Sequence, residues 1–260
     1  MSITVGVGLS LQKNPILAVN EALRLAGLSI DYQKIDLVLV FSSTNLAYPS
    51  LLKTLSASLE DVPIIGCSGA AIICNQGIFK EGLVVMLISL PTEMHIHTAC
   101  VKDIKSKTPA GAGKELGEEL LFGSKNMRRA LSVIFSDGLM DEGSKMLYGL
   151  QESLGKSFPL FGASASDNLR FQKTYLYYNQ ELLPDSAAGI LWGGKMNFGL
   201  GIKHGWKPDC ANVHGLEEFD TDDKRDGPDG SWVEWEDSDG ENIDGIDLTE
   251  ASRIDRFARE

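Results

Sequence analysis

Short apolar runs alternate with longer amphipathic stretches along most of the chain. The runs at 36–41 (DLVLVF) and 131–135 (LSVIF) are continuously apolar, which is typical of strands covered on both faces. Apolar segments at 82–90 and 94–101 flank Pro91 and predict two antiparallel strands joined by a turn. Strands that alternate with helices in this way predict an α/β fold.

The amphipathic stretches begin with the residues that commonly start helices. Asn14-Pro15 and Thr108-Pro109 each place a capping side chain before a proline at the first helical position. Helices are therefore expected to follow both dipeptides. The apolar face of the first helix is expected to consist of Ile16, Leu17, Leu23 and Ala26.

Two blocks of sequence recur in the same order. VFSS at 40–43 matches IFSD at 134–137, and PIIGCSGA at 63–70 matches PLFGASAS at 159–166. Two copies are too few for a solenoid, so we expect two supersecondary units packed together. The predicted fold is α/β with two related halves, an internal pseudo-repeat of buried strands, helices and antiparallel strand pairs.

Small polar residues follow the buried strands in both halves. Ligands of open α/β sheets bind beyond the carboxyl ends of strands, where glycines and hydroxyls let a ligand approach the backbone. The alternative for any one loop is that these residues only end strands and cap helices. No P-loop lysine and no GxGxxG motif follows a strand, so a nucleotide is not expected. The expected ligand-binding residues are Ser42, Ser43, Cys67, Ser68, Ser136, Asp137, Ser164, Ser166 and Asp167.

Two other kinds of chemistry remain open. Cys67 would be a nucleophile if a base lay beside it, but no histidine is near in the sequence, and a small buried residue is the simpler role. His204 ends the last expected strand, at 196–203, and would be either an axial haem ligand or a hydrogen-bonded strand end. No metal site and no other cofactor is expected.

The net charge of −12 lies in the C-terminal part of the chain. Residues 211–260 hold 17 acidic and 5 basic residues, whereas residues 1–210 hold 19 of each. The neutral body lacks the basic surface that nucleic-acid binding requires. We expect a domain at residues 1–208, followed at 209–260 by an acidic, turn-rich extension without a core of its own.

Cysteine usage and hydropathy indicate the compartment. No apolar run approaches the roughly 20 residues of a membrane span, and the N-terminus has no basic region ahead of an apolar one. The four cysteines form no CxxC pair, which favours free thiols in a reducing compartment. The protein is expected in the cytoplasm and away from membranes.

Four motifs occur in the order seen in a known family: PIIGCSGA at 63–70, FSDGLMDE at 135–142, PLFGASASD at 159–167 and GIKHGWKP at 201–208. With them, residues 1–208 resemble the N-terminal domain of the FIST family (F-box and intracellular signal transduction). The resemblance implies an intracellular sensory domain, not an enzyme. It implies an amino-acid-like or other polar small ligand, and a separate signalling partner protein. Related proteins bind haem and sense nitric oxide, so a haem sensor using His204 and an enzyme using Cys67 are the alternatives.

Overall fold

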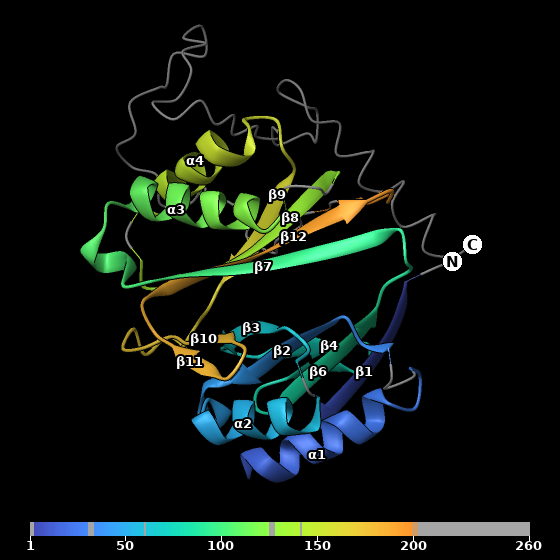
Figure 1. Cartoon of the computed structure of the whole chain (residues 1–260). Helices are drawn as coiled ribbons and strands as arrows, with labels where there is room; N and C mark the ends of the chain where they lie inside the picture. The colour runs from blue at the N-terminus through green and yellow to red at the C-terminus, as the bar shows by residue number, and fades with distance from the viewer. Residues whose placement is uncertain are drawn as a thin grey trace, which may run out of the picture. The chain divides into compact units, whose positions relative to one another are not determined.

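The computed structural model describes residues 3–30, 34–59, 61–124, 128–140, 142–199 and 201. The chain divides into a compact unit, residues 1–196, and a second unit that begins at Asn197. The compact unit contains two mixed sheets, each with two helices on one face (Figure 1). The expected α/β class is confirmed. Whether the domain ends at residue 208, as the sequence suggests, stays a prediction.

The first sheet is built mainly from the N-terminal half. Its strands β1 (Thr4–Ser10), β6 (Leu83–Ser89), β2 (Leu37–Ser43) and β3 (Ile64–Gly69) lie side by side in that order, and β2 is parallel to β3. α1 (Pro15–Ala26) and α2 (Pro49–Ser58) cover its outer face, and a short 3-10 helix, η2 (Thr44–Leu46), follows β2. The strands β4 (Ile72–Cys74) and β5 (Gly77–Phe79) form a separate hairpin.

The second sheet repeats this arrangement. Its strands β7 (Met94–Lys102), β12 (Ser186–Gly194), β8 (Arg129–Ser136) and β9 (Leu160–Ser164) lie in that order, and β8 is parallel to β9. α3 (Pro109–Phe122) and α4 (Gly143–Leu154) cover its outer face, and η3 (Ile104–Ser106) follows β7. The hairpin of β10 (Leu176–Tyr178) and β11 (Glu181–Leu183) lies between β9 and β12 in the chain.

The hairpin β10–β11 joins the two halves. Although it belongs to the C-terminal half, it extends the first sheet, because β10 pairs antiparallel with β3. Leu176 lies opposite Cys67 and Tyr177 opposite Gly66. The first sheet therefore has six strands, of which the last two come from the other half.

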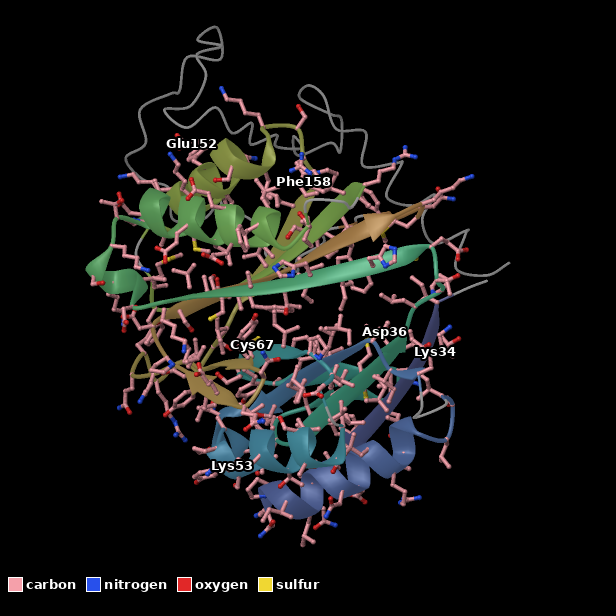
Figure 2. All side chains as sticks on the ribbon, in the orientation of Figure 1. Lys34, Asp36, Lys53, Cys67, Glu152 and Phe158 are labelled. Carbon is pink, nitrogen blue, oxygen red and sulfur yellow. The ribbon has the colours of Figure 1, made fainter. Side chains whose placement is uncertain are left out.

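Apolar side chains from both sheets fill the space between them (Figure 2). The layers thus follow the order helices, sheet, sheet, helices, with separate cores beneath each helical layer. This central core includes Leu37, Ile65, Cys67, Ile88, Phe135, Ala165, Leu176, Ala188, Ile190 and Trp192.

The face that α1 buries agrees with the expected one in part, because Leu23 and Ala26 are buried as predicted. Ile16 and Leu17 are exposed, and small residues such as Ala18 and Ala22 contact the sheet instead. α1 lies close to β1 at Ala22, since a Cβ at Gly8 would lie 1.8 Å from the carbonyl oxygen of Ala22.

The strands on either side of Pro91 also differ from the expectation. β6 and β7 do not pair with each other, because β6 lies between β1 and β2 whereas β7 pairs with β12. The segment around Pro91 passes from one sheet to the other, and Leu90 and Met94 at its ends are buried in the central core. β6 pairs with β1 on one side and with β2 on the other, so neither of its edges is available to β7. β7 lies in the second sheet instead.

A pair of equivalent glycines fixes how closely the parallel strands approach. A Cβ at Gly66 would lie 1.8 Å from the carbonyl oxygen of Val40, and a Cβ at Gly162 would lie 1.8 Å from that of Ile134. Each glycine is also the register partner of that residue across its parallel pair. The matching sequence blocks therefore meet the same steric requirement in both sheets.

Gly66→Ala is expected to lower the free energy of unfolding by about 1–3 kcal/mol, since the added methyl group forces β2 and β3 apart. Gly143→Ala is the matched control, because the nearest heavy atom to a Cβ there is Met140 Cε at 3.7 Å. Urea unfolding followed by circular dichroism measures both variants. Equal stability of the two would contradict the close approach of β2 and β3.

Candidate functional site

The four loops that the sequence indicated lie together at one end of the two sheets. The residues after β3 and β9 are joined directly, because the backbone N–H of Ser166 donates to the Ser68 carbonyl oxygen at 3.0 Å. The Ser68 hydroxyl donates to the Ser166 carbonyl oxygen at 3.0 Å, and the Ala70 N–H donates to the Ser166 hydroxyl at 2.8 Å. Three hydrogen bonds thus connect the halves at the carboxyl ends of their strands.

In the first half the serines at the strand ends are fully used by the protein itself. Ser42 and Ser68 are register partners, and both are buried. The Ser42 hydroxyl lies 2.6 Å from the Tyr177 hydroxyl, and the Ser68 hydroxyl accepts the Tyr175 N–H at 3.1 Å. Ser43 accepts the Gly82 N–H at 3.2 Å. The segment that enters β10 therefore covers this end of the first half.

In the second half the equivalent pair is open. Ser136 and Ser164 are register partners whose hydroxyl oxygens lie 3.0 Å apart, and Ser164 is exposed. No strand in the described part of the chain lies beyond β9 as β10 lies beyond β3. The same two serines are thus closed in one half and accessible in the other.

Asp137 is buried and serves the loop after β8. Its Oδ1 accepts the Leu139 N–H at 2.9 Å and the Thr174 hydroxyl, and its Oδ2 lies 3.8 Å from Lys105 Nζ. Thr174 lies just ahead of β10, so this carboxylate also ties the entry of the hairpin to the end of β8. A ligand would have to share Asp137 with these partners.

Asp167 organises the loop that follows β9. Its carboxylate accepts four backbone N–H groups, those of Arg170, Phe171, Gln172 and Lys173, at 2.7–3.1 Å. Burial alone would raise the pKa of this carboxyl, but these four donors outweigh it and hold the pKa below its ordinary value. The bonds stabilise a turn in which Asn168, Leu169 and Phe171 have positive φ angles near 50–60°.

Cys67 lies in the central core beneath the same loops. Burial raises the pKa of its thiol to about 12, so the thiol stays protonated at neutral pH. The thiolate is the nucleophilic form, and the surroundings of Cys67 do not favour it. A packing role fits this position between the sheets.

His204 and the acidic extension lie outside the described residues, so the haem alternative stays a prediction. Within residues 3–199, apart from the gaps given above, no three His, Cys, Asp or Glu side chains are grouped to hold a metal ion. The helices of that part are each too short or too polar to cross a membrane.

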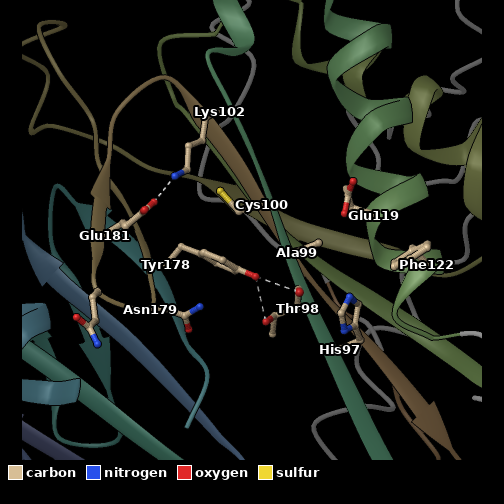
Figure 3. A pocket seen from close by; sticks show the side chains of 11 residues that line it. His97, Thr98, Ala99, Cys100, Lys102, Glu119, Phe122, Tyr178, Asn179 and Glu181 are labelled. Carbon is tan, nitrogen blue, oxygen red and sulfur yellow. Dashed lines mark hydrogen bonds and ion pairs between the residues drawn. The ribbon is translucent and has the colours of Figure 1, made fainter. Parts of the chain in front are cut away.

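A cavity that the sequence did not indicate lies along the edge of β7. It has a volume of about 530 Å³, is open to solvent, and is lined by β7, the C-terminal end of α3 and the hairpin β10–β11 (Figure 3). A second cavity of about 600 Å³ adjoins it and shares Thr98, Asn179 and Gln180. The first cavity is lined by His97, Thr98, Ala99, Cys100, Lys102, Glu119, Phe122, Tyr178, Asn179, Gln180 and Glu181.

Side chains from both sheets meet across this cavity. The Tyr178 hydroxyl reaches from β10 to β7, where it donates to the Thr98 carbonyl oxygen at 3.0 Å (Figure 3). Lys102 of β7 forms an ion pair with Glu181 of β11, and this bond raises the pKa of the lysine. Burial raises the pKa of Cys100 to about 11. The cavity wall therefore combines polar and apolar side chains, and Lys102 and Glu181 in it are paired with each other.

Sequence reasoning missed this cavity because its walls are far apart in the chain. Residues 97–102, 119–122 and 178–181 come together only after β10 has paired with β3. None of the nine predicted site residues lines either cavity. The alternating polar residues of β7 indicate a face that is not fully buried, but the sequence gives no indication of which residues lie opposite them.

The fold is an α/β domain in which two packed sheets are each covered by helices on the outer face. Residues 36–209 match the family model of the FIST N domain, which is more than half of the chain, and the protein belongs to this family. FIST domains are sensory domains of signal transduction. The resemblance noted from the motif order is confirmed.

Other known proteins are similar to this chain at greater distance. MJ1623, an uncharacterised protein of Methanocaldococcus jannaschii, is 22% identical over 181 residues, which cover 66% of this chain and 34% of that protein. The chain thus spans about a third of the length of this curated relative. Two solved structures of cyanuric acid hydrolase, one from A. caulinodans, are similar with TM-scores of 0.41 and 0.40 and identities of 10% and 7%. They cover 74% and 75% of this chain, and the matches span 69% and 71% of the solved chains.

Asp167→Asn is expected to destabilise the protein at pH 7, because an amide cannot accept four N–H groups. The folded-state pKa lies below the unfolded value of about 3.9, so the carboxylate stabilises the fold above that pH, and its contribution disappears as the pH falls through the folded value. Urea midpoints of wild type and variant should differ at pH 7 and converge as the pH is lowered through the folded-state pKa of Asp167. Asp103→Asn is the control, since Asp103 is exposed and does not cap η3, and its midpoint should stay close to wild type.

Cys67 is expected to resist alkylation in the native protein, because its buried thiol is protonated and inaccessible. Iodoacetamide at pH 8 followed by peptide mass spectrometry should leave Cys67 unmodified in buffer and modify it fully in concentrated urea. Rapid native labelling of Cys67 would support the nucleophile alternative.

Proposed function

We propose that this FIST domain senses a polar small molecule that binds in the cavity between β7, α3 and the hairpin β10–β11. The observation that carries the proposal is that the walls come from both sheets, with Thr98 and Lys102 on one side and Tyr178 and Glu181 on the other. A ligand there contacts both sheets at once, because the hairpin β10–β11 belongs to the first sheet and β7 to the second. Binding would thus change how the two sheets pack, and a signalling partner could detect that change.

The lining supports a ligand with both donors and acceptors. Thr98 and Tyr178 offer hydroxyls, Asn179 and Gln180 offer amides, and the Lys102–Glu181 pair offers a charge of each sign. A zwitterion such as a free amino acid has a group for each member of that pair. The volume of about 530 Å³ lies within the range of small-molecule sites, roughly 300–1,000 Å³.

The nine residues predicted from the sequence remain a second candidate location for the same ligand. The observation in its favour is the pair of half-buried Ser136 and exposed Ser164, whose hydroxyls bond to each other and can turn toward a ligand. This location offers hydroxyls but lacks a free charge pair, since Asp137 and Asp167 already accept several hydrogen bonds.

A thermal-shift screen against amino acids and related metabolites tests the function, because a ligand that binds the native state raises its melting temperature. With the best ligand in hand, Lys102→Met is expected to weaken binding at least about tenfold, through the loss of a charged hydrogen bond. The ligand-free melt should change little, because exposed ion pairs contribute about 0–1 kcal/mol. Lys107→Met is the matched control, since Lys107 forms a comparable ion pair with Glu115 away from the cavity.

The double variant Ser136→Ala, Ser164→Ala separates the two locations. Undiminished affinity in this variant, together with the loss in Lys102→Met, supports the cavity, whereas the opposite pattern places the ligand at the predicted loops. Failure of every metabolite to shift the melt would contradict a sensor of this class. An absorption band at the blue end of the visible spectrum in the purified protein would favour haem instead.

A further inference from the structure

Each half carries a hairpin between its third and last strands. In the second half this is β10–β11, which lies between β9 and β12, and in the first half it is β4–β5, which lies between β3 and β6. The two hairpins hold equivalent places in two halves that have the same order of elements and the same strand order. Their partners differ, however, since β10 pairs with β3 and β4 pairs only with β5 among the described strands.

The covered edge of β3 shows what such a hairpin does. The Ser68 N–H donates to the Tyr175 carbonyl oxygen at 2.9 Å, and the Ile64 carbonyl oxygen accepts the Asn179 N–H at 2.7 Å. Alternate residues of a strand turn their backbone groups to the same side, so those of Gly66 also face β10. Tyr177, opposite Gly66, is completely buried.

The equivalent edge of β9 has no such cover. Pro159 and Ala165 direct their backbone groups at β8, through a carbonyl oxygen that accepts the Ser132 N–H and an N–H that donates to Ser136. By the same alternation, Leu160, Gly162 and Ser164 direct theirs away from β8. No described strand pairs with that side, and residues 162–164 are exposed.

The hairpin β4–β5 has an equally uncovered face. Ile72 and Phe79 pack against the first sheet, near Leu9 and Val84. Ile73 and Ile78 lie opposite each other across the hairpin on its other side, and each is 73% exposed. Two branched apolar side chains side by side in water are unfavourable, and Ile73 is the middle residue of β4 as the buried Tyr177 is of β10.

Neither the edge of β9 nor the hairpin β4–β5 carries a charged residue that would disfavour pairing with another strand. Natural sheet edges are commonly protected by lysine, proline or a covering side chain. The edge of β7 has Lys102 and the Tyr178 hydroxyl on the Thr98 carbonyl oxygen. The edge of β9 (LFGAS) and the hairpin (IICNQGIF) contain no charged residue and no proline.

We propose that the β9 edge of one chain accepts the β4–β5 hairpin of a second copy of this chain. β4 then runs antiparallel to β9 with Ile73 opposite Gly162, as β10 runs antiparallel to β3 with Tyr177 opposite Gly66. Within the described residues each copy presents both the uncovered edge of β9 and the uncovered hairpin β4–β5, so a two-fold dimer pairs both in both copies.

Ser136 and Ser164, which lie beside the edge of β9, are compatible with an apolar side chain such as Ile73 packed over them. In the first half Ser42 needs a hydroxyl partner, which Tyr177 supplies. In the second half Ser136 and Ser164 bond to each other, so an isoleucine above them leaves no hydroxyl unpaired. The docked hairpin covers this pair but leaves the cavity beside β7 accessible.

The proposal is tested on the 260-residue chain by analytical ultracentrifugation over a concentration series, with a dimer expected. Ile73→Lys should raise the dimer dissociation constant at least about tenfold, because it places a charge in the interface. Leu28→Lys is the matched control, since Leu28 is 74% exposed and lies after α1, and it should leave the constant unchanged.

Ser164→Pro tests the acceptor side. It removes an N–H that faces away from β8, which a free edge tolerates, so the monomer should stay folded while dimerisation weakens at least about tenfold. Hydrogen exchange on the wild type provides a readout that needs no variant, because the amides of Gly162 and Ser164 should become protected as the dimer forms.

A chain that stays monomeric at all concentrations would overturn the proposal. So would a dimer that tolerates Ile73→Lys, or one in which the Gly162 and Ser164 amides exchange as fast as in the monomer. Because neither variant touches the cavity at β7, a failed ligand screen leaves this result unaffected.

Discussion

The pairing of β10 with β3 is the interaction on which the rest of the structure depends. It brings a strand of the second half into the first sheet and buries Tyr177 beneath α2, where the hydroxyl meets Ser42. It also carries Tyr178 and Glu181 to the edge of β7, and so forms one wall of the cavity. Without this pairing the two halves would share the apolar contacts between their sheets and the hydrogen bonds of Ser68 and Ala70 with Ser166.

Much of the local structure follows from the sequence. The continuous apolar runs became buried strands, Asn14 and Thr108 cap helices as expected, and the repeated blocks occupy equivalent places in the two sheets. These features depend on patterns within a single short segment, so the sequence of that segment is enough to predict them. The convergence of the serine loops also followed, because parallel strands bring their carboxyl ends to one edge.

The remainder could not be predicted because it depends on which segments meet. The sequence around residues 82–101 predicts two strands but does not tell that they lie in different sheets. Ile16 and Leu17 were expected in the core, yet both are exposed, and α1 approaches the glycines of β1 at Ala22 and Ala26. Ser42 and Ser136 are matched by sequence, yet one is buried and the other accessible, because the covering strand comes from elsewhere in the chain.

The position of the hairpin β10–β11 in the first sheet also affects when the two halves can fold during synthesis. The helices and central strands of the first sheet are complete by Ser89, but the core between them also includes Tyr177 of the second half. Until that tyrosine has left the ribosome, β3 presents an open edge and the nascent first half lacks part of its core. Contacts between residues so distant in the chain slow folding, because a long loop must close before they form. The first half therefore completes its core only after the second half has been synthesised, and the two halves fold as one cooperative unit.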